Sequence, residues 1–194
     1  DHPDFQTELA RFNVEVNVPP TALHHGGLTK LEESLRQRLD DARERSVTEG
    51  ADMVMIGILP TLGPEHLQAP SMSADSRYSV LNDQVLAARG EDIRIAVEGA
   101  ERLELVADTV LPEAACTSTQ LHVQVRPDRF AAYWNASQAV CALQVAIGAN
   151  SPYFLGKELW RETRIPLFEQ STDTRSEELK AQGVSHGCGS ASAG

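Results

Sequence analysis

The chain has 194 residues and a formal net charge of −11, from 28 acidic and 17 basic residues. Such an acidic chain lacks the basic face that displaces counterions from nucleic acid, and an anionic membrane surface does not attract it. Its length fits one domain or a large part of one, and 41% hydrophobic residues are enough for a buried core. We therefore expect neither a nucleic acid nor a membrane as partner.

The chain also shows no sign of export or of a metal-binding cysteine motif. No apolar run approaches the roughly 18–20 residues that span a bilayer, and the first residues are charged, without a signal-peptide core. Cys116, Cys141 and Cys188 are too widely spaced for a metal site or a disulfide framework. We expect a cytoplasmic protein with reduced cysteines.

In chain order, the predicted elements begin with a half-buried strand over residues 12–18, where apolar and polar residues alternate. Helical periodicity predicts a helix from about Lys30 to Val47, capped by Thr29. The nearly continuous apolar run 53–59 is typical of a strand covered on both faces. One short helical turn is expected after Pro64.

The second half of the chain continues this mixture of helices and strands. The predicted elements are a helix from Asp75 or Ser76 to Gly90, a hairpin of strands 93–97 and 103–106, an alternating strand over 118–125, a long helix over 128–148, and helices over 155–163 and 176–182. Strands interleaved with helices, several of them alternating, predict an α+β fold with an antiparallel sheet and packed helices.

Two of these predicted strands have unusually polar faces. The polar residues are Asn13, Glu15 and Asn17 on one strand, and Ser118, Gln120, His122 and Gln124 on the other. If both strands belonged to one sheet, these faces would form the floor of a concave site while the apolar faces packed on helices. The alternative is a solvated sheet face, which is common in antiparallel proteins.

Several single residues are candidates for binding. Glu8 and Glu15 are possible carboxylate ligands of magnesium. His122 could be a metal ligand, a proton carrier, a substrate hydrogen-bond donor or a purely structural residue, and no paired histidines indicate zinc. Arg161 and Arg164 could clamp phosphate or carboxylate, and the alternative is a salt bridge with a nearby glutamate such as Glu162. Neither a Walker sequence nor a nucleophile elbow occurs in the chain.

Five segments resemble a known family, and they occur in its order. They are Glu8–Pro20 (ELARFNVEVNVPP), Arg77-Tyr78, Thr117–Val125 (TSTQLHVQV), Ala149–Gly156 (ANSPYFLG) and Glu162–Gln170 (ETRIPLFEQ). Together they resemble motifs of the bacterial glutamate–cysteine ligases of the second type, which are carboxylate–amine ligases.

This resemblance implies a glutamine-synthetase-like fold, in which an antiparallel sheet forms a funnel. It also implies that ATP phosphorylates the side-chain carboxylate of glutamate, that an amine such as cysteine attacks the acyl phosphate, and that Mg2+ neutralises phosphate charge, as in glutathione biosynthesis. The roles that it implies are Glu15 and Glu8 at the metal, Gln120, His122 and Arg164 at the nucleotide, Asn13, Glu15, Arg77, Tyr78 and Asn150 at the substrate, and Arg164 and His122 in catalysis.

Two departures from the family predict a partial catalytic domain over residues 1–184 that is inactive alone. The acidic G-x-E-x-E strand of the family is absent, and residues 185–194 match nothing in it. Read in a frame shifted by two nucleotides, GC-rich codons for residues 184–194 give VARVWFGERW, which resembles the family's continuation. We therefore hypothesise a frameshift near Gly183 and an unstructured tail after it. The alternatives are a non-catalytic protein that binds an amino acid or a nucleotide, and a structural or interaction domain.

Overall fold

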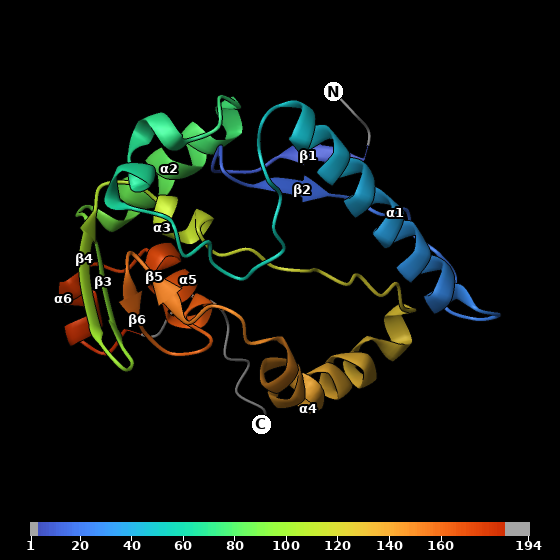
Figure 1. The fold of residues 1–194 in the computed structure, drawn as a ribbon. Coiled ribbons are helices and arrows are strands. Elements are labelled where there is room, and N and C mark those ends of the chain that lie inside the picture. Colours follow the sequence, from blue (N-terminus) through green and yellow to red (C-terminus); the bar gives the residue numbers. More distant parts are fainter. Residues whose placement is uncertain (1–3, 185–194) are drawn as a thin grey trace. The chain divides into compact units, whose positions relative to one another are not determined.

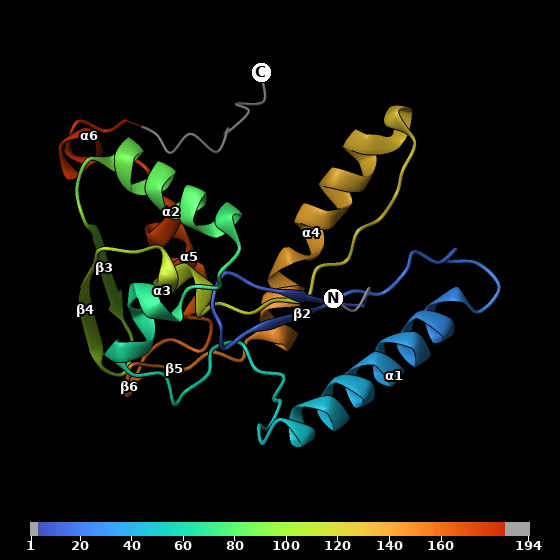
Figure 2. The same cartoon turned by 90° about the horizontal axis from the view of Figure 1, so that it is seen from above.

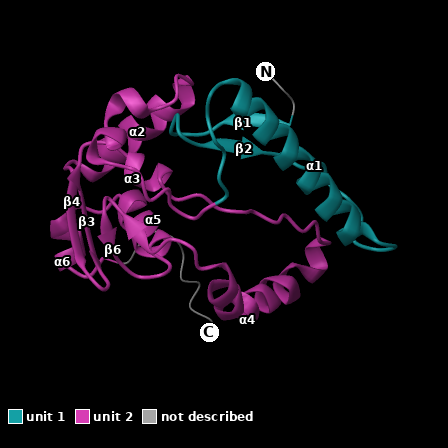
Figure 3. Ribbon diagram, in the orientation of Figure 1, with its two compact units in different colours: residues 1–55 teal, residues 56–194 magenta. Residues whose placement is uncertain are grey.

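The computed structural model describes residues 4–184, so the tail predicted over 185–194 lies outside the described residues. The fold is α+β, as predicted, with six α-helices and small antiparallel sheets in the described part of the chain (Figure 1). The chain divides into two compact units, residues 1–55 and 56–194 (Figure 3). None of the helices between residues 4 and 184 is long and apolar enough to cross a membrane.

Unit 1 contains β1 (Phe5–Thr7), β2 (Val14–Val16) and α1 (Gly27–Thr48). β1 and β2 pair antiparallel, with Gln6 opposite Glu15. The predicted strand over 12–18 is therefore too long, because its ladder is limited by the three residues of its partner. α1 begins after Gly26, whose φ of 80° only glycine adopts easily, so the prediction of Thr29 as the cap was wrong.

The helix of unit 1 carries a half-buried face of leucines and two buried residues, Gly27 and Ala42. Arg38 joins this face to the start of β1, because its Nη2 lies 3.1 Å from Oδ1 of Asp4. The guanidinium of Arg45 lies 6.0 Å from the centre of the Phe5 ring. Unit 1 is thus a short hairpin fastened to a long helix by side chains at two points.

Unit 2 contains most of the buried core. Its elements are η1 (Pro64–Leu67), η2 (Ala69–Ser71), α2 (Ser76–Arg89), β3 (Ile93–Glu98), β4 (Arg102–Ala107), α3 (Leu111–Ala114), η3 (Pro127–Arg129), α4 (Phe130–Gly148), β5 (Tyr153–Phe154), β6 (Lys157–Glu158), α5 (Arg164–Thr172) and α6 (Glu177–Ala181). Figure 2 shows the same elements from above.

The centre of unit 2 is the β3–β4 hairpin, whose existence the alternating pattern predicted correctly. Ile93, Ile95 and Val97 alternate with exposed residues and are almost completely buried. α5 packs against β3, and the Gln170 side chain hydrogen-bonds both the amide and the carbonyl of Ala96, at 2.7 and 3.1 Å. This amide substitutes for a neighbouring strand, because it satisfies backbone groups on the outer edge of β3.

The ends of α2 follow the sequence signals closely. The Asp75 carboxylate accepts a hydrogen bond from the Arg77 amide at 3.0 Å, and Gly90 ends the helix in the left-handed conformation, with φ at 75°. Arg89, in the last turn, is buried and donates to the Asp173 carbonyl at 2.8 Å. These contacts attach α2 to the C-terminal part of the described chain.

The predicted helix over 155–163 is replaced by the short hairpin of β5 and β6. Leu155 and Gly156 have φ angles of 50° and 74°, which are the two consecutive left-handed residues of a type I′ turn. The apolar residues that suggested a helical face lie instead on a strand and in a loop, with Phe154 and Leu159 buried. The local turn therefore overrode helical periodicity.

The predicted strand over 53–59 is irregular. The backbone amide and carbonyl of Gly57, near its centre, bond two different loops. The amide donates to the Asn150 carbonyl, and the carbonyl accepts from the Thr117 amide. Ile58 is buried, but Met55 is 77% exposed. The part of the run around Gly57 therefore bonds two loops of unit 2, and within the described residues no strand pairs with it.

The predicted strand over 118–125 is also absent from the structure. We call residues 118–147, which comprise this irregular segment and nearly all of α4, the arm. Within the described chain, residues 118–125 make no backbone–backbone hydrogen bond, and Leu121 is 73% exposed. An alternating sequence forms a strand only when a ladder partner and a packed face are present. The condition for a shared sheet floor is therefore not met, because residues 14–16 pair only with β1 and residues 118–125 belong to no sheet among residues 4–184.

Candidate functional site

The structure gathers two of the predicted site residues, Asn150 and Arg164, at one place in unit 2. We call this place the polar junction and define it by Gly57, Thr117, Ser151, Glu162 and Arg164. Its segments are far apart in sequence, and α5 begins there with Arg164. A parallel bridge between Ser151 and Glu162 joins the loop after α4 to the loop before α5.

The Arg164 guanidinium is the centre of the polar junction. Its Nε lies 2.5 Å from Oε1 of Glu162, and its Nη2 lies 2.6 Å from Oε2, so the ion pair is bidentate. Nη1 donates to the Thr117 carbonyl at 2.8 Å, and Nη2 also donates to the Gly148 carbonyl at 3.0 Å. Four of the five guanidinium N–H groups are thereby used.

Glu162 is almost completely buried, with 5% of its surface exposed, whereas Arg164 is partly accessible. Ser151 is fully buried and donates its hydroxyl to Oε1 of Glu162 at 3.1 Å, while its Oγ accepts from the Arg164 amide at 3.3 Å. The hydrogen bonds to Glu162 raise the pKa of Arg164, which therefore stays charged. A buried carboxylate is stable only when it is paired and hydrogen-bonded, as it is here.

Gly57 lets its own segment approach the loops at Asn150 and Thr117 closely at the polar junction. Its amide donates to the Asn150 carbonyl at 3.1 Å and its carbonyl accepts from the Thr117 amide at 2.9 Å. A Cβ at this position would lie 2.6 Å from the Asn150 carbonyl oxygen and 3.1 Å from Nε of Arg164. The close approach therefore requires glycine.

Cys116 adjoins the polar junction without offering a reactive thiolate. Burial raises the pKa of its thiol to about 12, and the nearby Glu113 carboxylate adds to this effect. Its Sγ contacts the carbonyl oxygens of Pro112 and Arg164 at 3.9 and 3.8 Å. A thiol in this protonated state is a packing group and not a nucleophile at neutral pH.

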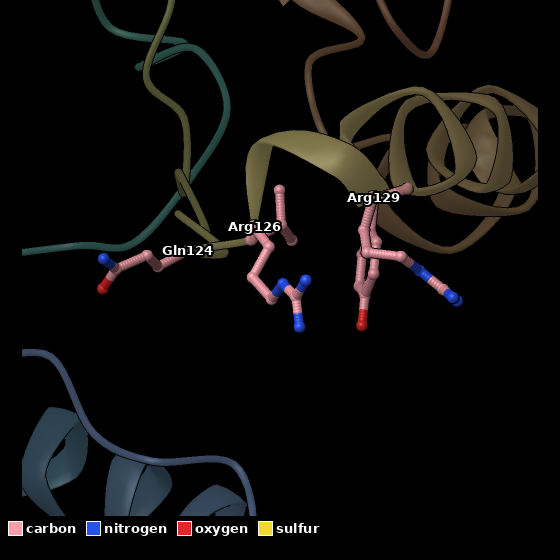
Figure 4. Close-up of a pocket in the computed structure, with 5 residues that line it drawn as sticks. Gln124, Arg126 and Arg129 are labelled. Carbon is pink, nitrogen blue, oxygen red and sulfur yellow. The ribbon is translucent and has the colours of Figure 1, made fainter.

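Gln120 and His122 are exposed and lie on the irregular part of the arm. The neighbouring surface has an open depression lined by Gln124, Arg126, Arg129 and other residues. Figure 4 shows that the labelled side chains point in different directions and do not converge on one point. The guanidinium of Arg126 is paired with Asp128, at 2.9 Å from Oδ1. The depression therefore has no focused binding geometry in this structure.

The predicted metal and substrate residues of unit 1 lie on the β1–β2 hairpin and the turn that joins its strands. Glu8 accepts a hydrogen bond from the Leu9 amide at 3.1 Å, and the Asn13 amide donates to the Ala10 carbonyl at 3.1 Å. Glu15 is half-buried within β2. Among residues 4–184, no group of three His, Cys, Asp or Glu side chains is placed to hold a metal ion.

Arg77 and Tyr78 form a local pair in the first turn of α2. The Arg77 guanidinium lies 4.5 Å from the centre of the Tyr78 ring and its Nη2 bonds the Tyr78 hydroxyl. Tyr78 is buried, and Arg77 also lies 3.4 Å from the Asp75 carboxylate. The pair belongs to α2 and not to the segments that form the polar junction, so its predicted role in substrate binding remains a hypothesis.

Sequence reasoning missed most of the polar junction. Glu162 was considered only as a surface partner for Arg164, and Ser151, Thr117 and Gly57 were given no role. The signal was present, because the ANSP and ETR segments that match the family carry Ser151, Glu162 and Arg164. A buried pair two residues apart in a loop has no periodicity that could distinguish it from a surface salt bridge.

These features define an α+β protein with a small hairpin core and a buried arginine–carboxylate junction. Comparison with known families then places it, because the family model of Glutamate-cysteine ligase family 2 (GCS2) matches residues 1–182. The chain belongs to this family, as its motifs indicated. No curated protein and no solved structure matches the chain in the corresponding searches.

Proposed function

We propose that this chain supplies the nucleotide- and substrate-binding residues of an ATP-dependent ligase that forms a γ-glutamyl amide bond. The observation that carries this proposal is the family match over residues 1–182. The proposed substrates are ATP, glutamate and an amine such as cysteine. The net charge of −11 argues against a polyanionic partner such as nucleic acid.

The proposed contacts with ATP come from the arm and the polar junction. Gln120 and His122 are exposed, so their polar groups are accessible to a nucleotide. Arg164 retains one N–H group and its positive charge for a phosphate or a carboxylate, and it is also a proposed catalytic residue with His122. Asn150, exposed beside the junction, is a proposed contact of glutamate.

The proposed residues of unit 1 are Glu15 and Glu8 for Mg2+, with Asn13 and Glu15 also at the substrate. The described residues do not gather an all-protein metal cage. Magnesium is commonly held by one or two carboxylates together with substrate phosphates and water, so a single carboxylate such as Glu15 fits this mode. When bound, the ion would neutralise charge on the phosphate oxygens.

The proposed reaction has two balanced steps. The side-chain carboxylate of glutamate attacks the γ-phosphorus of ATP, which forms an acyl phosphate and releases ADP. The amine nitrogen then attacks the acyl carbon, the C–O bond to phosphate breaks, and the amine loses a proton. The task of the protein in such a reaction is to position the reactants and screen their charge, and a fixed arginine is suited to it.

The proposal is tested by isothermal titration of the chain with ATP and Mg2+, and separately with glutamate. We expect saturable binding of the nucleotide that the double variant Gln120→Ala/His122→Ala weakens on the order of tenfold or more, the cost of losing two hydrogen bonds. The matched control Gln37→Ala/His24→Ala changes exposed residues of unit 1 and should bind like the parent chain. No binding of either ligand by the parent chain would contradict the proposal.

A non-catalytic binding protein is the second candidate. It is favoured by the exposed polar groups of Gln120 and His122, which can hold a ligand without carrying out a reaction. ADP release separates the two candidates, because a ligase or its partial reaction produces ADP from ATP and glutamate. Because residues 1–184 are expected to be inactive alone, the assay uses the chain extended through the shifted frame after Gly183. Ligand binding without ADP by that extended chain would support the binding protein.

We also propose that residues 1–184 are part of a larger catalytic domain. The support is the apolar surface of the arm, where α4 has no buried residue in the described chain and Ile147 is 88% exposed. The DNA on both sides of the reading frame tests this proposal. A shifted frame that encodes VWFGERW after Gly183 would support it, and a clean stop after residue 194 would contradict the proposed frameshift.

A further inference from the structure

The Arg164 guanidinium holds both ends of the arm. Its Nη1 bonds the Thr117 carbonyl, immediately before the arm, and its Nη2 bonds the Gly148 carbonyl, immediately after it. Gly148 is the last residue of α4, where carbonyl groups lack helical partners and a cation is favoured. The Arg164 guanidinium therefore bridges the two ends of residues 118–147, in addition to the backbone bonds that join Gly57 to Thr117 and Asn150.

The orientation of that guanidinium is set by Glu162. The carboxylate accepts hydrogen bonds from Nε and from one N–H of Nη2. The guanidinium is planar, so the other Nη2 N–H then points toward the Gly148 carbonyl and an Nη1 N–H points toward the Thr117 carbonyl. Ser151 fixes the carboxylate in turn, at 3.1 Å from Oε1. Because Glu162 is buried and cannot exchange its partner for water, this orientation is rigid.

The arm has few contacts of its own that could replace this attachment. Among the described helices and strands, α4 packs to any extent only against η3, the turn directly before it. Residues 118–125 have no backbone partner in that range. The arm is therefore positioned mainly from its two ends.

We propose that Glu162 is a positioning residue, which locks Arg164 across the ends of the arm and thereby fixes where Gln120 and His122 are presented. Its effect on ligand binding rests on the proposed function, whereas its effect on the arm does not. Glu162 need not touch a ligand in this role. It acts through Arg164 and the Thr117 and Gly148 carbonyls.

The test is hydrogen–deuterium exchange of the whole chain, followed by mass spectrometry, for the parent and for Glu162→Gln. The substitution keeps the side-chain volume, but the amide can accept only one of the two arginine hydrogen bonds. We expect exchange at residues 117 and 148–151 to rise on the order of tenfold or more, as for the loss of a buried ion pair, while β3 and β4 exchange as in the parent. Glu169→Gln changes an exposed glutamate of α5, the helix that begins with Arg164, and should leave both regions unchanged.

A second variant keeps the inference testable if Glu162→Gln unfolds the unit. Arg164→Lys retains the charge opposite Glu162 but lacks the fork that reaches both carbonyls, so it should loosen the ends of the arm in the same way. Glu162→Asp should restore part of the protection, because it retains the charge. Unchanged exchange at residues 117 and 148–151 in both Glu162→Gln and Arg164→Lys would overturn the inference.

Titration of the same variants with ATP and Mg2+ separates this inference from the proposed function. If the parent binds, Glu162→Gln should weaken binding while Glu169→Gln does not. If the parent does not bind, the proposed function fails, and the exchange result still decides the role of Glu162. If Glu162→Gln raises exchange at residues 117 and 148–151 but binds the nucleotide as tightly as the parent, the claim that Glu162 positions Gln120 and His122 for the ligand is overturned.

Discussion

The β3–β4 hairpin and the arm carry equally regular sequence patterns, but only the hairpin becomes regular structure with a buried face. In β3, every second residue is buried against α5 and the edge is satisfied by Gln170. In residues 118–125 the same alternation is exposed throughout, apart from a half-buried Val125. The difference shows that alternation specifies which residues share a face, whereas a strand also requires a partner.

The largest expected effect is in the core that the hairpin shares with α5. Leu167 is completely buried, so Leu167→Ala should lower the free energy of unfolding by about 2–5 kcal/mol through lost burial and the remaining cavity. Urea unfolding followed by tryptophan fluorescence measures this, since Trp134 and Trp160 both belong to unit 2. A loss below about 0.5 kcal/mol, typical of surface positions, would contradict the assignment of this core.

A somewhat smaller effect is expected where the polar junction requires a close approach. Gly57→Ala places a methyl group against the Asn150 carbonyl and should cost about 1–3 kcal/mol, as other overpacking substitutions do. The matched control is Gly148→Ala, where a Cβ would meet no atom within 4 Å in the described structure and an alanine should favour the helix. Equal unfolding free energies for the two variants would contradict the contacts described for Gly57.

The buried thiol of Cys116 makes the stability of the folded chain depend on pH. The raised pKa of Cys116 favours the folded state at and below pH 9.0, the ordinary value for the thiol. The unfolded chain loses this proton first, so the stabilisation is lost progressively as the pH rises from 9.0 towards about 12. Urea unfolding of the parent and of Cys116→Ala between pH 8 and 10.5 should show a steeper loss of stability in the parent.

Alkylation at pH 8 tests the same difference directly. Cys141 is exposed on α4 and should react with iodoacetamide at least about tenfold faster than the protonated thiol of Cys116. Peptide mass spectrometry assigns the labelled residues. Faster labelling of Cys116 would show that its surroundings are more open than the structure has them.

The smallest effect is expected on the arm. Ile147 is 88% exposed, so Ile147→Ala should change the free energy of unfolding by no more than about 0.5 kcal/mol. The same urea experiment compares it with Leu167→Ala. A loss above about 2 kcal/mol would show that α4 is buried in solution, and the contrast between the arm and the hairpin would then fail.

Much of the local structure could be predicted from the sequence. The caps Asp75 and Gly90 bound α2 because capping is a short-range effect, and the β3–β4 hairpin followed from alternation on both sides of a tight turn. The sequence could not predict the turn at Leu155, because a non-glycine residue with φ of 50° has little local signature. Nor could it predict which alternating segment would find a partner.

The candidate site was only partly predictable for the same reason. Asn150 and Arg164 were identified from motifs, and the structure brings their segments together. The carboxylate that orients Arg164 was not distinguished from a surface charge, because burial depends on segments from residues 57, 117 and 151. The sheet that could have joined Glu15 with His122 does not form, since β2 pairs only with β1 and residues 118–125 form no strand in the described chain.

Hydrogen exchange of the parent chain with and without ATP, Mg2+ and glutamate tests the central claim most directly. Residues 118–125 have no backbone partner in the described chain, so they should exchange rapidly without ligand. If these residues bind a nucleotide as proposed, saturating ligand should slow their exchange on the order of tenfold or more while β3 and β4 remain unchanged. Identical exchange with and without saturating ligand would contradict the assignment of this segment to a ligase site.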